Sequence, residues 1–315
     1  MKTIKRQIIS LIFCLLFCVI SLPASAFAYD EIDTQAKCSL SISFAPNGEA
    51  AQNVNFRLYR VADVFSDGVF LTESFKKYPV VFEQDEDTWR NLAITLSGYV
   101  YADSISSDYS AITSADGVAL FKDLPVGIYL VIADVYKSNN TVYIPQSFLV
   151  SLPGNDVNNA LNYNVTANVK YDFFEEHEQV NVDVLKVWKG SSEHPKSVTV
   201  ELYNGAQLYD TVVLDKSNNW QHKWEKLNSD GNWNIVEKSV FNGYVVSADK
   251  QNNSFVITNS SLEVTYPPSD SAPPESSERL PQTGLLWWPV PMFIAAGLVL
   301  IIIGYIRSRG SAYEK

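Results

Sequence analysis

Residues 180–188 read VNVDVLKVW, and this stretch decides the fold of the second half of the chain. Side chains alternate between the two faces of a β-strand, so every second residue shares a face. One face carries Val180, Val182, Val184, Lys186 and Trp188. The pattern predicts a strand whose valine face lies in a protein core. Lys186 therefore points to where the core should be.

Two more polar residues end apolar half-strands in the same region. In WNIVE (233–237), Glu237 shares a face with Trp233 and Ile235. In SFVITNS (254–260), Asn259 shares a face with Phe255 and Ile257. An amine, a carboxyl and a carboxamide are thus predicted at the core of one small β domain.

These three groups have a chemistry of their own when they are buried. Burial lowers the pKa of a lysine and raises that of a carboxylic acid, which favours a neutral amine beside a neutral acid. A neutral Lys186 could attack the side-chain carbonyl of Asn259 while Glu237 shuttles protons and polarises that carbonyl. Ammonia would leave, and an intramolecular isopeptide bond would remain. By itself, the pattern also fits a solvent-facing Lys186 and Asn259 beside an ordinary Glu237.

Residues 180–261 resemble the B-type repeat of the collagen-adhesin (Cna) family, which occurs in stalks and pilins of Gram-positive bacteria. The matching features are the opening KVW with Lys186, SVTVELYNG at 197–205, Asn219-Trp220, Glu237, Gly243-Tyr244 and the closing Ile257-Thr258-Asn259. The resemblance implies a Lys186–Asn259 isopeptide with Glu237 as its catalyst. The sequence departs from the family at Asn-Ile-Val-Glu, where Tyr-Thr-Val-Glu is more familiar.

The first module is expected at 36–172 and is predicted to be a divergent β-sandwich of the same kind. GVALFKDLPVGIYLV at 117–131 is similar to a segment of pilin-type B repeats. Helical spacing of apolar residues after an acidic start predicts a short helix at 87–101. The apolar face of the first strand carries no lysine and consists of Cys38, Leu40, Ile42 and Phe44. We therefore predict no isopeptide at the matching positions, and a buried, unreactive Cys38.

The expected fold class is all-β, with two immunoglobulin-like sandwich modules in series at 36–172 and 180–261. The acidic stretch 172–179 is predicted to connect them. Residues 262–279 are rich in Pro and Ser, which predicts an extended stalk.

Both ends of the chain carry targeting signals. Residues 1–28 have a basic start, an apolar core and a small-residue exit, as in a secretory signal peptide cleaved after Ala26 or Ala28. Residues 280–315 contain an LPxTG pentapeptide, an apolar run long enough to span a bilayer, and Arg307 and Arg309. This arrangement resembles the cell-wall sorting signal of Gram-positive surface proteins, in which a sortase joins the Thr283 carbonyl to a peptidoglycan amine. The pentapeptide residues are Leu280, Pro281, Gln282, Thr283 and Gly284.

Composition argues against several other classes of function. The formal net charge of −11 disfavours nucleic acid as a partner. Three histidines and three cysteines, of which only Cys38 follows the leader, predict neither a metal site nor a cofactor. His177-Glu178 lacks the second histidine of a zinc protease, and Thr34-Gln35 precedes Cys38, unlike the order in thioester adhesins.

The sequence therefore predicts a non-enzymatic, wall-anchored stalk or adhesin whose first module binds an unknown host or microbial ligand. The alternative is an ancillary or basal pilus subunit that joins other subunits. Backbone pilins use a lysine in a Tyr-Pro-Lys context as the acceptor amine. The nearest position here is Lys170, in NVTANVKYD, which lacks the Tyr-Pro.

Overall fold

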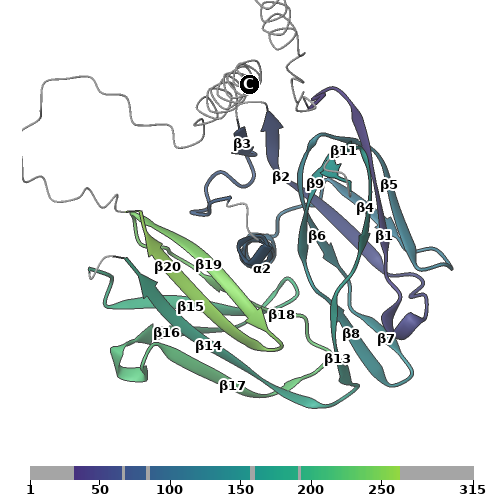
Figure 1. The fold of residues 1–315 in the computed structure, drawn as a ribbon. Helices are drawn as coiled ribbons and strands as arrows, with labels where there is room; N and C mark the ends of the chain where they lie inside the picture. The colour runs from purple at the N-terminus through teal and green to yellow at the C-terminus, as the bar shows by residue number, and fades with distance from the viewer. Residues whose placement is uncertain (1–31, 66–67, 83–85, 157–159, 191–192, 263–315) are drawn as a thin grey trace, which may run out of the picture. The chain divides into compact units, whose positions relative to one another are not determined.

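The computed structural model of the chain describes residues 32–65, 68–82, 86–156, 160–190 and 193–262. These residues belong to one compact unit that ends at Glu263. Strands dominate, and the helix α2 (Glu86–Ala102) lies between the sheets of the two sandwich modules (Figure 1). The predicted all-β fold with two immunoglobulin-like modules and a short helix is confirmed for the described residues.

The first module is built mostly from antiparallel strands that enclose an apolar core, with one parallel pair, β1 and β12. One sheet has the order β3-β2-β6-β9, with β4 also paired to β2. Its strands are β2 (Asn55–Phe65), β3 (Gly68–Leu71), β4 (Tyr109–Ile112), β6 (Gly127–Ala133) and β9 (Phe148–Leu152). A facing sheet, β12-β1-β5, consists of β1 (Lys37–Ser43), β5 (Val118–Pro125) and β12 (Asn164–Asn168). The predicted face of β1 is confirmed, because Cys38, Leu40, Ile42 and Phe44 are all buried.

Shorter strands complete the first module. The sheet β13-β8-β7 consists of β7 (Tyr136–Ser138), β8 (Thr141–Pro145) and β13 (Tyr171–Glu175), and a small ribbon joins β10 (Gly154–Asn155) to β11 (Leu161–Asn162). A 3-10 turn, η1, covers Pro46–Gly48. The predicted connector at 172–179 is wrong over its first half, since Asp172 to Glu175 pair with Thr141 to Ile144 of β8. Only 176–178 separate β13 from the next strand.

The second module is a sandwich of a sheet β17-β14-β20-β19 and a sheet β16-β15-β18. Its strands are β14 (Gln179–Lys189), β15 (Ser197–Asn204), β16 (Gln207–Asp215), β17 (Gln221–Asn228), β18 (Trp233–Glu237), β19 (Tyr244–Gln251) and β20 (Ser254–Ser261), with the 3-10 turn η2 at Lys216–Asn218. The first strand, β14, pairs in parallel with the last, β20. This pairing places the two ends of the module side by side.

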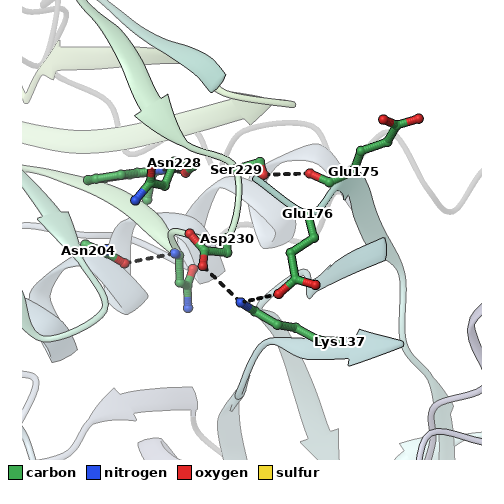
Figure 2. A network of polar contacts seen from close by, with 9 residues as sticks. Lys137, Glu175, Glu176, Asn204, Asn228, Ser229 and Asp230 are labelled. Atoms are coloured by element: carbon green, nitrogen blue, oxygen red, sulfur yellow. Dashed lines mark hydrogen bonds and ion pairs between the residues drawn. The ribbon is translucent and has the colours of Figure 1, made fainter. Parts of the chain in front are cut away.

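A cluster of polar contacts joins the modules near the connector (Figure 2). Lys137 of β7 reaches Glu176 at 3.1 Å and Asp230 of the second module at 2.9 Å. Ser229 donates its hydroxyl to the Glu175 carbonyl oxygen at 2.8 Å. The three charged side chains are all partly exposed to solvent, so these ion pairs contribute mainly to orientation rather than to stability.

Candidate functional site

Lys186 lies inside the second sandwich, as its place in the alternating strand predicts. Val180, Val182, Val184 and Lys186 are all buried, and Trp188 is half-buried. In the parallel register Lys186 pairs with Ile257, and Trp188 pairs with Asn259. Asn259 is fully buried on the same sheet. Neighbouring strands thus hold the amine and the carboxamide two residues apart in register.

Glu237 reaches the same point from the opposite sheet. It is the last residue of β18 and is buried together with the rest of that strand. Its Oε1 accepts a hydrogen bond from Asn259 Nδ2 at 2.8 Å, and its Oε2 lies 3.6 Å from Lys186 Nζ. The structure therefore brings all three predicted site residues together, with the carboxyl between the amine and the amide.

The hydrogen bond between Glu237 and the amide nitrogen of Asn259 puts the carboxyl in position for proton transfer. Nδ2 of Asn259 is the atom that would leave as ammonia, so a proton held on Glu237 is within hydrogen-bond reach of the leaving group. Asn259 Oδ1 and Glu237 Oε2 are two of the eight buried side-chain atoms without a hydrogen-bond partner in the described part of the chain. Buried polar atoms are usually hydrogen-bonded, so both oxygens are free to accept a proton.

The electrostatics of the site favour uncharged forms of both ionisable groups. Burial lowers the pKa of Lys186 to about 8, although the nearby Glu237 opposes this shift. Burial also raises the pKa of Glu237, against the opposing effects of Lys186 and the hydrogen bond from Asn259. Both side chains have no solvent exposure. Burial thus shifts both groups toward their uncharged forms, which amine attack on the amide requires.

Aromatic rings cover the amine. Lys186 Nζ lies 4.0 Å from the centre of the Trp188 ring and also donates to the Val187 carbonyl oxygen at 3.0 Å. Trp188 stacks on His194 at a centroid distance of 4.7 Å and meets Trp220 and Tyr244 edge-on at 5.5 and 5.4 Å. Strand alternation predicts Trp188 on the core face, but it does not predict that the Trp188 ring lies over Lys186.

The other residues singled out in the sequence lie away from this site. Lys170 is exposed, with its side chain 80% accessible and Glu86 at 4.0 Å. Cys38 is a buried free cysteine, and burial raises the pKa of its thiol. No group of three or more His, Cys, Asp or Glu suited to a metal ion occurs in the part of the chain that the structure describes.

The predicted targeting signals lie beyond the described ranges. The predicted leader at 1–28, the pentapeptide Leu280 to Gly284 and the predicted membrane span all fall there, as does the predicted stalk at 262–279 apart from its first residue. In the parts of 32–262 that the structure describes, no helix is long and apolar enough to cross a bilayer.

Sequence reasoning also missed a contribution of helix α2 to this region. Tyr99 is buried, and burial raises its pKa, with a further contribution from the negative charge of Glu237. A first-module side chain thus lies within electrostatic range of the second module's buried acid. A glycine inside the predicted helix, Gly98, was the available signal, because glycine in a helix interior is unfavourable unless close packing requires it.

Comparison with known proteins gives distant structural similarities. The single B1 repeat unit of the collagen-binding surface protein of Staphylococcus aureus is 16% identical, with 72% of this chain and 99% of that chain covered and a TM-score of 0.26. The full-length major pilin SpaD of Corynebacterium diphtheriae is 16% identical, with 73% and 67% covered and a TM-score of 0.33. The minor pilin GBS52 of Streptococcus agalactiae is 18% identical, with 74% and 100% covered and a TM-score of 0.24.

A search of curated proteins finds no match. The comparison with family models finds a match to one segment of the chain. Lys186, Glu237 and Asn259 all lie within that segment. Residues 182–260 match the model of the Cna protein B-type domain.

Proposed function

We propose that the protein is a non-enzymatic stalk or adhesin of the Gram-positive cell surface, anchored by sortase and stabilised by an isopeptide bond between Lys186 and Asn259. The observation that carries the proposal is the buried carboxyl of Glu237, held against both the amine and the amide. The match of 182–260 to the Cna B-type domain supports the same conclusion.

The reaction needs no cofactor and balances within the site. The lone pair of neutral Lys186 Nζ attacks Cγ of Asn259, and a new C–N bond forms. Glu237 accepts a proton from the attacking nitrogen and delivers one to Nδ2. The Cγ–Nδ2 bond then breaks, and one molecule of ammonia leaves. The protein completes this reaction once, so it has no turnover.

The bond would tie the first strand of the module to its last strand. It closes a loop of about 73 residues between positions 186 and 259, which the loop-entropy relation values at about 4 kcal/mol. Since β14 follows the connector and β20 precedes the stalk, tension along the chain would pass through the covalent link. The hydrogen bonds of the second sandwich would then carry little of the load.

The remaining parts of the proposal concern placement on the cell. A secretory leader at 1–28 would export the chain, and sortase would join Thr283 to peptidoglycan after cleavage before Gly284. The stalk at 262–279 would extend through the wall. The first module would then face outward and present its loops to a host or microbial ligand.

The experiment is a tryptic digest of the full chain analysed by mass spectrometry. The bond blocks cleavage at Lys186 and joins the peptide 171–189 to the peptide 251–279, with a combined mass lower by one ammonia. Lys186→Ala and Asn259→Ala should abolish the joined species. Lys223→Ala, which removes an exposed lysine of the same sheet, should retain it. Separate peptides in the folded wild-type protein would refute the crosslink.

A second candidate function is that of a pilus subunit. It is favoured by the exposure of Lys170, which is available to an acceptor reaction between chains. This candidate expects a covalent ladder of high-mass species on intact cells that disappears in Lys170→Ala. A single anchored species in both strains excludes it and leaves the stalk or adhesin.

A further inference from the structure

The second sandwich has an open side next to the crosslinking site. β18 and β19 are edge strands of their respective sheets. Unpaired backbone groups on such edges need a cover, since they otherwise bind water or other chains. β18 carries Glu237, and Val246 of β19 pairs directly with Asn259. We call the space between these edges the seam.

Groups from the first module occupy the seam. The Val246 amide donates to the Pro79 carbonyl oxygen at 2.9 Å, and the Ala248 amide donates to the Thr95 hydroxyl at 2.8 Å. Thr95 is itself buried, and it donates its hydroxyl proton to the Asn91 carbonyl oxygen. Alternate edge amides of β19 are thus satisfied by a loop and a helix that precede it by more than a hundred residues.

Helix α2 also lies directly against β18. A Cβ added at Gly98 would lie 2.6 Å from the Ile235 carbonyl oxygen and 2.8 Å from Val236 Cγ2. Every residue of β18 is buried, on both faces, whereas simple strand alternation leaves one face of this edge strand open to solvent. The helix therefore covers the strand that ends in Glu237 and leaves its side chains little contact with water.

We propose that Pro79, Thr95 and Gly98 of the first module are positioning residues for the Lys186–Asn259 reaction, because they close the seam and keep water from the reacting groups. This inference rests on the proposed isopeptide function. The two modules are then one reactive unit, and the bond forms efficiently only after the first module has folded and docked. The first module acts through the strands β18 and β19 and touches no reacting atom.

The test follows bond formation in the full chain. Protein from brief cell-free synthesis is incubated, quenched in acid and digested, and the joined fraction of peptides 171–189 and 251–279 is measured against time. Thr95→Val keeps the shape of the side chain but leaves the Ala248 amide without its acceptor, so it should slow the reaction several-fold. Thr95→Ser retains the hydroxyl and should restore a rate close to that of the wild type.

A second variant separates helix docking from helix stability. Gly98→Ala raises the intrinsic helix propensity by about 1 kcal/mol but moves the helix away from β18, so it should also slow the reaction. Gly154→Ala is the control, because its added Cβ meets Val165 Cγ2 at 3.2 Å and the Ser151 carbonyl oxygen at 3.5 Å, both within the first module and not in β18 or β19. Its rate should equal that of the wild type.

The pH profile distinguishes closure of the seam from general destabilisation. Hydration of the site would raise the pKa of Lys186 from about 8 toward its ordinary value. Each pKa unit of that rise lowers the fraction of neutral amine at neutral pH about tenfold. The deficit of Thr95→Val should therefore be largest at neutral pH and shrink toward pH 9. A deficit that is equal at every pH, or no deficit in either variant, overturns the inference. A wild-type chain without the bond overturns the proposed function itself.

Discussion

Replacement of Glu237 by glutamine isolates the effect of the covalent bond. Gln retains the size of the side chain and an oxygen that accepts from Asn259 Nδ2, so the packing of β18 should persist. It cannot exchange a carboxyl proton, so the transfer from Lys186 to the leaving amide nitrogen is lost. We expect Glu237→Gln to fold with Lys186 and Asn259 unjoined.

The expected loss of stability follows from the loop that stays open. A loop of about 73 residues corresponds to about 4 kcal/mol, a large part of the 5–15 kcal/mol typical of a native protein. For a unit of this size, each kcal/mol changes the midpoint by about 2–4 °C, so the midpoint should fall by roughly 8–16 °C. Tryptophan fluorescence reports this transition because Trp188, Trp220, Trp224 and Trp233 lie in the second module.

A buried glutamate of the adjacent strand supplies the control. Glu201 of β15 accepts a hydrogen bond from the Tyr203 hydroxyl at 2.7 Å and has no contact with the amide of Asn259. Glu201→Gln should retain the joined peptides and most of the stability. If Glu237→Gln yields the joined peptides, or unfolds at the wild-type midpoint, the assignment of Glu237 as the proton carrier is refuted.

Three further predictions concern other parts of the chain. Bond formation should accelerate about tenfold per pH unit up to about pH 8 and then level off, because the pKa of Lys186 is about 8; a rate independent of pH between 6 and 8, measured by quenched digestion, would contradict this. Native protein should resist alkylation at Cys38 until it is denatured, because burial raises the thiol pKa, and rapid native labelling would argue against it. Thr283→Ala should move the protein from the wall fraction to the membrane fraction on immunoblots, and an unchanged wall fraction would exclude the sorting signal.

The core of the second module could be predicted because the alternation of side chains along a strand is a local property of the sequence. A period of two determines which side chains of 180–188 share a face, and this alone predicts that Lys186 points inward. The same rule applied to 233–237 and 254–260 gives Glu237 and Asn259. The rule was incomplete for β18, since Asn234 and Val236 are also buried. Their burial depends on a helix far away in the sequence.

The docking of α2 could not be predicted from periodicity, because an apolar stripe does not specify the sheet that it will cover. The helical spacing predicts that Leu92 and Leu96 face a core, and nothing in the pattern predicts a role for Thr95. Only Gly98 violated a local rule, at an expected cost of about 1 kcal/mol relative to alanine. Such violations mark places where distant structure overrides local preference. Here the distant structure is β18, which approaches the helix so closely at Gly98 that a Cβ there would clash with the Ile235 carbonyl oxygen.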